Sequence, residues 1–302
     1  MTPRTPPATV RFAPAVWTLS TLLLATSVVA CVTALVTPEL IHGPAVMVGS
    51  MRGTALVVLI VGVPMLVVAM AIAAAGRGGL LAVVGWIAGL VFSTYQAWMF
   101  LFAVPFNGLF LVYVAMLASG FWAIVALLGE VRAERLADAA GPRMPSRLLA
   151  GWMVASCVAF YGLWLRNVVP ALFDSTAPAF LDGTGMVTAT NYVLDMAFFL
   201  PFTMLAAVGL WRRTPWGVVV GGAMLIVLVL ESVAIAIDQW FGSAADPASP
   251  VASTAVTPMF AIVALIGAVM VGLWYRGTSR GSERRGRSAS AGSASAAGRA
   301  NG

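Results

Sequence analysis

The chain has 302 residues, of which 61% are hydrophobic and only 9% are charged. Because soluble globular domains carry about 25% charged residues, this composition excludes a soluble protein and indicates an integral membrane protein. The formal net charge is +6, and most of the excess follows Trp274. The chain lacks the basic groove with interleaved aromatic residues that is typical of nucleic-acid binding. We therefore expect the lipid bilayer, and no nucleic acid, as a partner.

Missing residue types exclude several kinds of catalytic and cofactor site. The chain has no lysine, which excludes lysine Schiff bases and phosphate-binding loops that need a lysine. The single histidine, His42, excludes a haem held by two histidines and the HExxH zinc motif. Glu39 could join it as a second metal ligand, but no third ligand is nearby. Cys31 and Cys157 are too few for a four-cysteine site, and both lie in apolar runs where a thiol behaves as a small hydrophobe. We expect no enzyme, no cofactor and no metal.

Eight apolar stretches are long enough to cross a membrane as helices, which takes about 20 residues each. Their runs are continuous and lack period-two alternation, so they predict helices and not a β-barrel. The predicted fold class is all-α, a polytopic transmembrane helical bundle of eight spans. In chain order the spans are 13–36, 54–75, 80–102, 109–129, 148–165, 192–211, 216–237 and 258–275.

The basic residues predict the orientation of these spans. All 17 are arginines, and all but Arg52 and Arg166 flank span ends that alternate consistently. By the positive-inside rule those ends are cytoplasmic, so both termini and the linker 130–147 face the cytoplasm of a cell-membrane protein. The N-terminal segment 1–12 is cytoplasmic as well. The basic tail 276–302 is predicted to be disordered, and it either anchors the topology or binds anionic lipid.

The first span contains a sequence that resembles a lipoprotein cleavage site at Val28-Val29-Ala30-Cys31. Cleavage there would leave seven spans and a lipidated Cys31. The apolar run continues through Val36, however, which is longer than the core of a signal peptide. We therefore expect a retained span.

Landmarks in the two halves of the chain recur at an offset close to 137 residues. Pro64 and Pro201 lie inside spans, and each precedes a short turn marked by an arginine, at Arg77 and Arg213. Small residues spaced four apart follow in the next span, a pattern that lets helices approach closely in lipid. This predicts two four-helix repeats, 13–129 and 148–275, related about an axis along the membrane normal. The alternative is a duplicated packing unit with no role in transport.

Two carboxylates lie inside predicted spans, where an ionisable group indicates function by default. Asp195 and Glu231 fall in the outer halves of the sixth and seventh spans, and Tyr95 and Gln96 lie at similar depth in the third. We predict that these four residues contribute to an outward-facing polar pocket between the halves that binds a substrate.

Arg52 and Arg166, the two exceptions to the charge rule, are predicted on the same side of the membrane as that pocket. Both are candidate substrate-binding residues. The alternative is that Arg166 forms an ion pair with Asp195 or Glu231 that only fixes the helix register.

Two stretches carry a resemblance to a known group of proteins. Tyr95-Gln96 with residues 105–114 (PFNGLFLVYV), and Leu194-Asp195 with residues 200–201 and 212–217 (RRTPWG), are similar to motifs of bacterial multi-pass membrane proteins with no assigned activity. The similarity covers residues 38–222, and this chain has Gln96 where the motif has asparagine. The lysine-free, Ala-, Gly- and Val-rich composition is typical of a GC-rich bacterial genome, such as an actinobacterial one.

These features favour a transporter or permease for a small solute or ion. The evidence is the repeat, the proline-broken spans and the carboxylates at matching depth. The alternative is a membrane sensor, scaffold or partner subunit that transports nothing. An intramembrane enzyme fits least, because no nucleophile lies beside a base.

Overall fold

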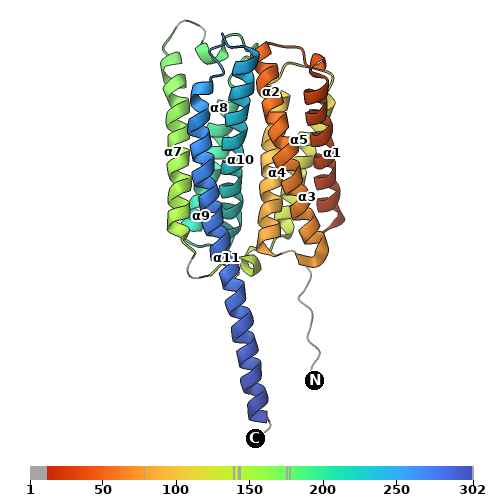
Figure 1. The fold of residues 1–302 in the computed structure, drawn as a ribbon, viewed down its shortest axis with the longest axis vertical. Helices are drawn as coiled ribbons and strands as arrows, with labels where there is room; N and C mark the ends of the chain where they lie inside the picture. Colours follow the sequence, from red (N-terminus) through yellow and green to blue (C-terminus); the bar gives the residue numbers. More distant parts are fainter. Residues whose placement is uncertain are drawn as a thin grey trace.

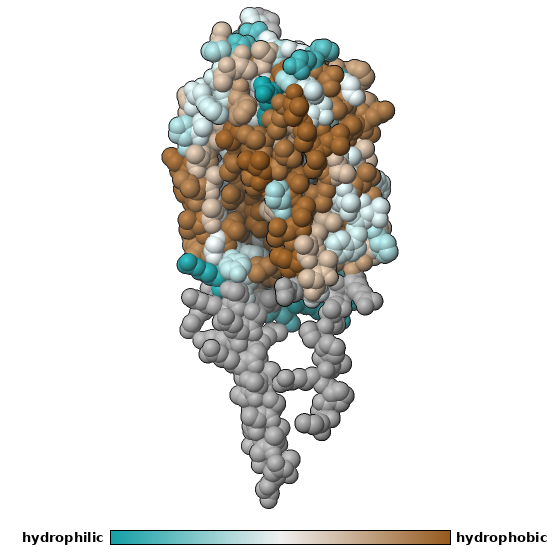
Figure 2. Space-filling model, turned by 45° about the vertical axis from the view of Figure 1, so that its right-hand side comes forward, coloured by the Kyte–Doolittle hydropathy of each residue, from teal (hydrophilic) through white to brown (hydrophobic). Residues whose placement is uncertain are grey.

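Eight long apolar helices form a single bundle in the computed structural model. The structure describes residues 12–77, 79–138, 140–141, 144–174, 176 and 178–300, with the side chains of residues 77 and 279–300 outside the description. Eight helices in this part are long and apolar enough to cross a membrane, and it contains no strand. On the face drawn in Figure 2, a hydrophobic band lies between more hydrophilic ends. The chain is therefore a multi-pass integral membrane protein, and the predicted all-α bundle of eight spans is confirmed.

The helices divide into two groups that lie side by side (Figure 1). The first group is α1 (Pro14–Val36), α2 (Ala45–Val57), α3 (Val63–Ile72), α4 (Leu80–Phe102) and α5 (Phe110–Glu130). The short α6 (Ala133–Ala137) then leads to the second group, which is α7 (Ser146–Ala171), α8 (Thr190–Leu194), α9 (Leu200–Trp211), α10 (Pro215–Ala245) and α11 (Thr257–Ala300).

The start of α1 and the last part of α11 lie at the same end of the bundle (Figure 1). We call the opposite end, where α2 begins and α10 ends, the outer end, following the predicted orientation. The tail 276–302 was predicted to be disordered. Most of its side chains lie outside the described part of the structure, so the predicted disorder stays a prediction. Cys31 and Cys157 are both buried and free.

Helices α4 and α10 form the centre of the bundle. In the most apolar stretch of each span, 78% of the residues of α4 and 72% of those of α10 are buried. The share is at most 44% in the other six spans. The two helices contact each other, and each also packs against helices of both groups. A polar side chain on the inner face of either helix is therefore shielded from lipid by the rest of the bundle.

Helices α2 and α10 extend further toward the outer end than their predicted spans, 54–75 and 216–237. A glycine seam, formed by Gly49 and Gly53 of α2 and Gly242 of α10, allows these extensions to pack together. A Cβ atom on Gly53 would lie 2.8 Å from the Ile237 carbonyl oxygen and 2.9 Å from the Asp238 Cα atom. The predicted start of the second span at residue 54 and the predicted end of the seventh at residue 237 are thus wrong, because contact between the two helices stabilises helical structure where hydropathy declines.

Each group contains a widened π-helical turn just before a proline, and the first group contains a further one at Ala73–Arg77. Val58–Gly62 joins α2 to α3 ahead of Pro64, and Asp195–Phe199 joins α8 to α9 ahead of Pro201. The two turns and the two prolines are each 137 positions apart. Proline lacks the backbone N–H that a regular turn needs, so the helix must rearrange there. The same break thus recurs in both groups, and the two four-helix repeats stay a prediction.

Candidate functional site

Three polar residues from three spans lie at one depth in the membrane. Gln96, Asp195 and Glu231 are each 16 residues from the inner end of their span, namely Leu80, Trp211 and Pro215. At 1.5 Å per residue this is about 24 Å, within a bundle that crosses a hydrocarbon core of about 30 Å. The structure thus brings residues of both halves together between α4 and α10, where the polar pocket was predicted. Their role as ligand contacts stays a prediction.

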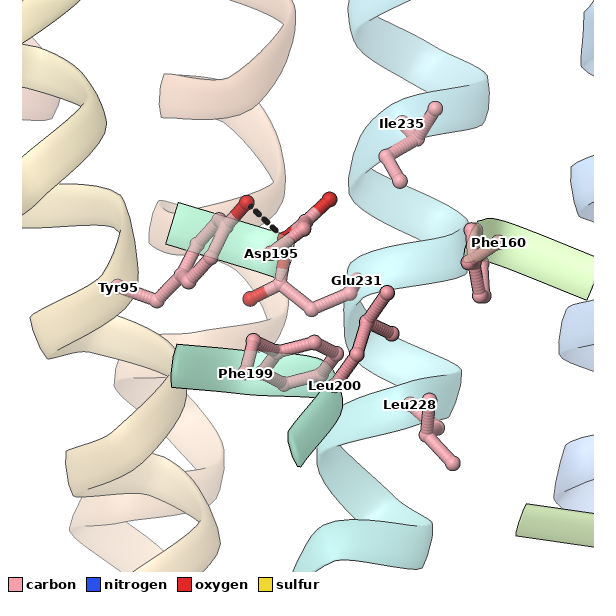
Figure 3. Close-up of a pocket in the computed structure, with 8 residues that line it drawn as sticks. All are labelled: Tyr95, Phe160, Asp195, Phe199, Leu200, Leu228, Glu231 and Ile235. Carbon is pink, nitrogen blue, oxygen red and sulfur yellow. Dashed lines mark hydrogen bonds between the residues drawn. The ribbon is translucent and has the colours of Figure 1, made fainter. Parts of the chain in front are cut away.

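Asp195 is the first residue of the π-helical turn between α8 and α9, and it is only 6% exposed. The Tyr95 hydroxyl of α4 donates a hydrogen bond of 2.7 Å to its Oδ1 atom, as Figure 3 shows. The indole N–H of Trp164, on α7, donates one of 2.9 Å to Oδ2. Each carboxylate oxygen of Asp195 therefore has a neutral donor, contributed by a different helix.

One face of α7 binds the broken segment that carries Asp195. Besides the Trp164 contact, the Tyr161 hydroxyl donates to the Met196 carbonyl oxygen at 2.9 Å, and the Cys157 thiol lies 3.8 Å from the Leu200 carbonyl oxygen. The three α7 side chains are spaced three or four residues apart, which places them on one helix face. A π-helical turn and a proline disturb the regular hydrogen bonding of a helix, and these contacts with α7 hold the broken segment and Asp195 in place.

Glu231 lies on the inner face of α10 and is also 6% exposed. The amide nitrogen Nε2 of Gln96 donates to both of its carboxylate oxygens, at 2.9 and 3.2 Å. Glu231 is close enough to Asp195 and Asp238 to interact with both electrostatically. Like Asp195, it has a neutral donor and acidic neighbours.

The two carboxylates line a small cavity whose other walls are mostly apolar (Figure 3). Its lining residues are Tyr95, Phe160, Asp195, Phe199, Leu200, Leu228, Glu231 and Ile235. The cavity offers about 10 Å³ to the centre of a water molecule, which is about the space that one water needs. In this conformation the site has room for a water molecule or a small ion, and no room for a larger solute.

The two predicted arginines lie outside this cavity. Arg166 is exposed on α7 and pairs with neither Asp195 nor Glu231, so the predicted register-fixing ion pair is not formed. Arg52 was expected at the end of an outer loop and instead lies within α2, at the glycine seam. In the described part of the chain, Asp195 and Glu231 therefore receive hydrogen bonds from neutral donors and form no ion pair.

Sequence reasoning missed Trp164, Tyr161 and Asp238. The two aromatic residues were hidden in an apolar run, although their spacing of three residues places them on one helix face. Asp238 lay outside the predicted spans, because the seventh was expected to end at residue 237. It lies seven residues after Glu231, so both are on the same side of α10. Asp238 interacts electrostatically with Tyr95 as well as with Glu231.

The fold and the site together define the class of this molecule, an eight-span helical membrane protein with paired carboxylates buried between its halves. No family model, curated protein or solved structure matches the chain. Its resemblance to bacterial multi-pass proteins therefore stays a prediction. Among the described residues, no three His, Cys, Asp or Glu side chains are grouped so that they could hold a metal ion.

Proposed function

We propose that this protein is a membrane transporter for a small solute or ion, in which Asp195 and Glu231 bind and release a proton. One observation carries the proposal: two neighbouring carboxyl groups are buried at the centre of the bundle, and the hydrogen-bond donors that they have among the described residues are neutral. Ionisable residues inside membrane spans are rare and face the interior of the bundle, and they mark substrate or ion pathways and proton relays.

The surroundings favour a proton over a metal cation as the species that neutralises the pair. Burying an uncompensated charge is costly, and two negative charges at short range in a medium of low dielectric constant also repel each other. A proton neutralises a carboxyl group without further ligands. A hard metal cation needs about six oxygen ligands, and the apolar side chains of Phe199, Leu200 and Leu228 supply none.

The architecture supports alternating access to this pair. The pair lies where the two predicted repeats meet, which is where secondary transporters place their sites. Asp195 begins a π-helical turn, and such turns occur frequently at functional sites. Movement of the α8–α9 break relative to α10 would change the distance between the two carboxyl groups and the access of water to them.

Transport is tested with purified protein in proteoliposomes that enclose a pH-sensitive dye. An imposed membrane potential is applied with the buffer alone and then with alkali cations, ammonium, amino acids and sugars in turn. We expect proton movement that depends on one of these conditions and is abolished by Glu231→Gln, which keeps an oxygen for the Gln96 amide. Glu39→Gln, at an exposed outer glutamate, serves as the matched control and should retain activity.

No protein-dependent proton or solute movement in any condition, from protein shown to be folded, would overturn the proposal. That result would favour the alternative of a sensor, scaffold or partner subunit. Equal activity in Glu231→Gln and the parent protein would overturn the role of the carboxyl pair.

A further inference from the structure

A third acidic residue, Asp238, lies on the same side of α10 as Glu231 and closer to the outer end. It follows Glu231 by two helical turns, about 10 Å along the helix. Asp238 is 23 residues from the inner end of the span at Pro215, about 35 Å along the helix, whereas Glu231 is about 24 Å from that end. Because the hydrocarbon core is about 30 Å thick, Asp238 lies near the outer membrane surface and Glu231 lies inside the core.

The carboxyl group of Asp238 has a buried oxygen atom that no described group satisfies. This atom, Oδ1, has no hydrogen-bond partner in the described part of the chain, although the side chain as a whole is only partly buried. Among the described residues, the neighbouring Gln239 acts on the carboxyl group and Arg52 of α2 does not. Unsatisfied buried polar atoms are uncommon, and each one needs an explanation. A carboxyl group that alternately binds and releases a proton provides one, because a permanent partner would favour a single charge state.

The backbone that carries this carboxyl group is fixed by its neighbours. Gly53 of α2 packs on Asp238, whose Cα atom would lie 2.9 Å from a Cβ atom at position 53. The Ser50 hydroxyl donates to the Asp238 carbonyl oxygen at 3.3 Å. The outer loop is attached at the next residue, since the Ser253 N–H donates to Oε1 of Gln239 at 3.0 Å. Asp238 is therefore held in place between the outer loop and the carboxyl pair.

Asp238 is also coupled to the carboxyl pair. Glu231 interacts electrostatically with both Asp195 and Asp238, and Tyr95 interacts with all three acidic residues. The Tyr95 hydroxyl donates to Asp195 at 2.7 Å, so one acid of the pair is hydrogen-bonded to a group within electrostatic range of Asp238. Ile235 lies between Glu231 and Asp238 along α10 and lines the cavity (Figure 3). The cavity therefore extends from the pair to within about one helical turn of Asp238.

We propose that Asp238 is the outer proton donor and acceptor of the carboxyl pair. It takes a proton from water at the outer surface and passes it inward through water to Asp195 or Glu231. It loses one proton for each one that the pair gains and returns to its carboxylate form, and the reverse steps release a proton. The outer route is the shorter one, because Glu231 lies only about 6 Å inside the outer boundary of the core. This inference rests on the proposed function, because a donor presupposes a pair that exchanges protons.

The rate at which the pair takes up protons tests this role without requiring transport. Protein in lipid nanodiscs is subjected to a rapid drop in pH, and the infrared carbonyl-stretch band of protonated carboxylic acids is followed over time. The signal of the pair is the part of this band that Glu231→Gln removes. We expect Asp238→Asn to slow its rise about a hundredfold, the lower end of what a positioned acid contributes to proton transfer, and to keep its final amplitude. Asp182→Asn, at an exposed outer aspartate, is the matched control and should keep the parent rate.

Two further measurements separate a proton donor from a residue that only stabilises the fold. Asp238→Glu keeps a carboxyl group and should retain most of the parent rate. Azide, a small weak acid that can replace the missing group, should speed uptake in Asp238→Asn and leave the parent protein unchanged. If Asp238→Asn does not fold, Asp238→Ser, which also lacks an acid, takes its place. Recovery with either glutamate or azide supports the donor role; a parent rate in the folded acid-free variant, or a slow rate that neither restores, would overturn it.

The donor role of Asp238 and the proposed function fail in different ways. A parent rate in Asp238→Asn, with a band that still depends on Glu231, would remove the donor and keep the proton-exchanging pair. A parent protein without any pH-dependent band that Glu231→Gln removes would overturn the proposed function and the donor role with it. Slow, azide-restored uptake in a protein that moves neither protons nor solutes in proteoliposomes would keep the donor and remove the transport role.

Discussion

The glycine seam should make Gly53→Ala strongly destabilising although alanine favours helices. A Cβ atom at position 53 would lie 2.8 Å from the Ile237 carbonyl oxygen and 2.9 Å from the Asp238 Cα atom. Both are backbone atoms of α10, so no side chain can rotate away. The helices must separate by several tenths of an ångström, and in lipid their association depends on close packing. Overpacking of this kind costs about 1–3 kcal/mol.

A second alanine variant isolates the packing cost from helix propensity. Gly151 lies in α7 with no atom within 4 Å of its Cβ position. Gly151→Ala should therefore stabilise the protein, by up to about 1 kcal/mol. Gly53→Ala has the same gain in propensity, and we expect a net loss of about 1–2 kcal/mol once the clash is included.

Reversible unfolding in lipid–detergent micelles, followed by tryptophan fluorescence, measures both variants. A Gly53→Ala protein as stable as the Gly151→Ala protein would refute the backbone contact between α2 and α10.

Two further variants test hydrogen bonds in the interior by the same unfolding assay. Trp164→Phe removes a donor from Asp195 and should lower the free energy of unfolding by about 1–2 kcal/mol. In a double-mutant cycle with Asp195→Leu the two substitutions should be coupled. Strictly additive effects would argue against the hydrogen bond. Trp86→Phe breaks the buried bond of 3.0 Å from its indole N–H to the Ser20 hydroxyl and should cost about 1–3 kcal/mol. Trp122→Phe, at an exposed tryptophan, should change stability little, and an equal loss in both variants would contradict the assignment.

Hydropathy and arginine placement predicted the class and the number of spans, because both depend on transfer of single segments into lipid. They did not predict the outer ends of α2 and α10. Residues 45–53 include Arg52 and three polar or glycine positions, which lower the hydropathy of the segment. The segment is nevertheless helical, because Gly49 and Gly53 pack against α10. That stabilisation comes from a helix nearly 200 positions away in the chain, which no local pattern reveals.

The candidate site could also be predicted only in part. Asp195 and Glu231 stood out as carboxylates within apolar spans, and Tyr95 and Gln96 stood out as polar residues at similar depth in the third span. Their partners were not evident. Trp164 becomes a donor to Asp195 only through the packing of α7 against the α8–α9 break. Which carboxylate Gln96 would contact also depends on how α4 packs against α10.

The central claim is that the buried carboxyl pair exchanges a proton with the solution, and infrared difference spectroscopy tests it most directly. Parent protein and Glu231→Gln in lipid are compared across a pH titration, without any solute. We predict a carbonyl-stretch band of a protonated carboxylic acid that changes with pH in the parent protein and is absent or displaced in Glu231→Gln. An identical pH-dependent spectrum for the two proteins would contradict the account.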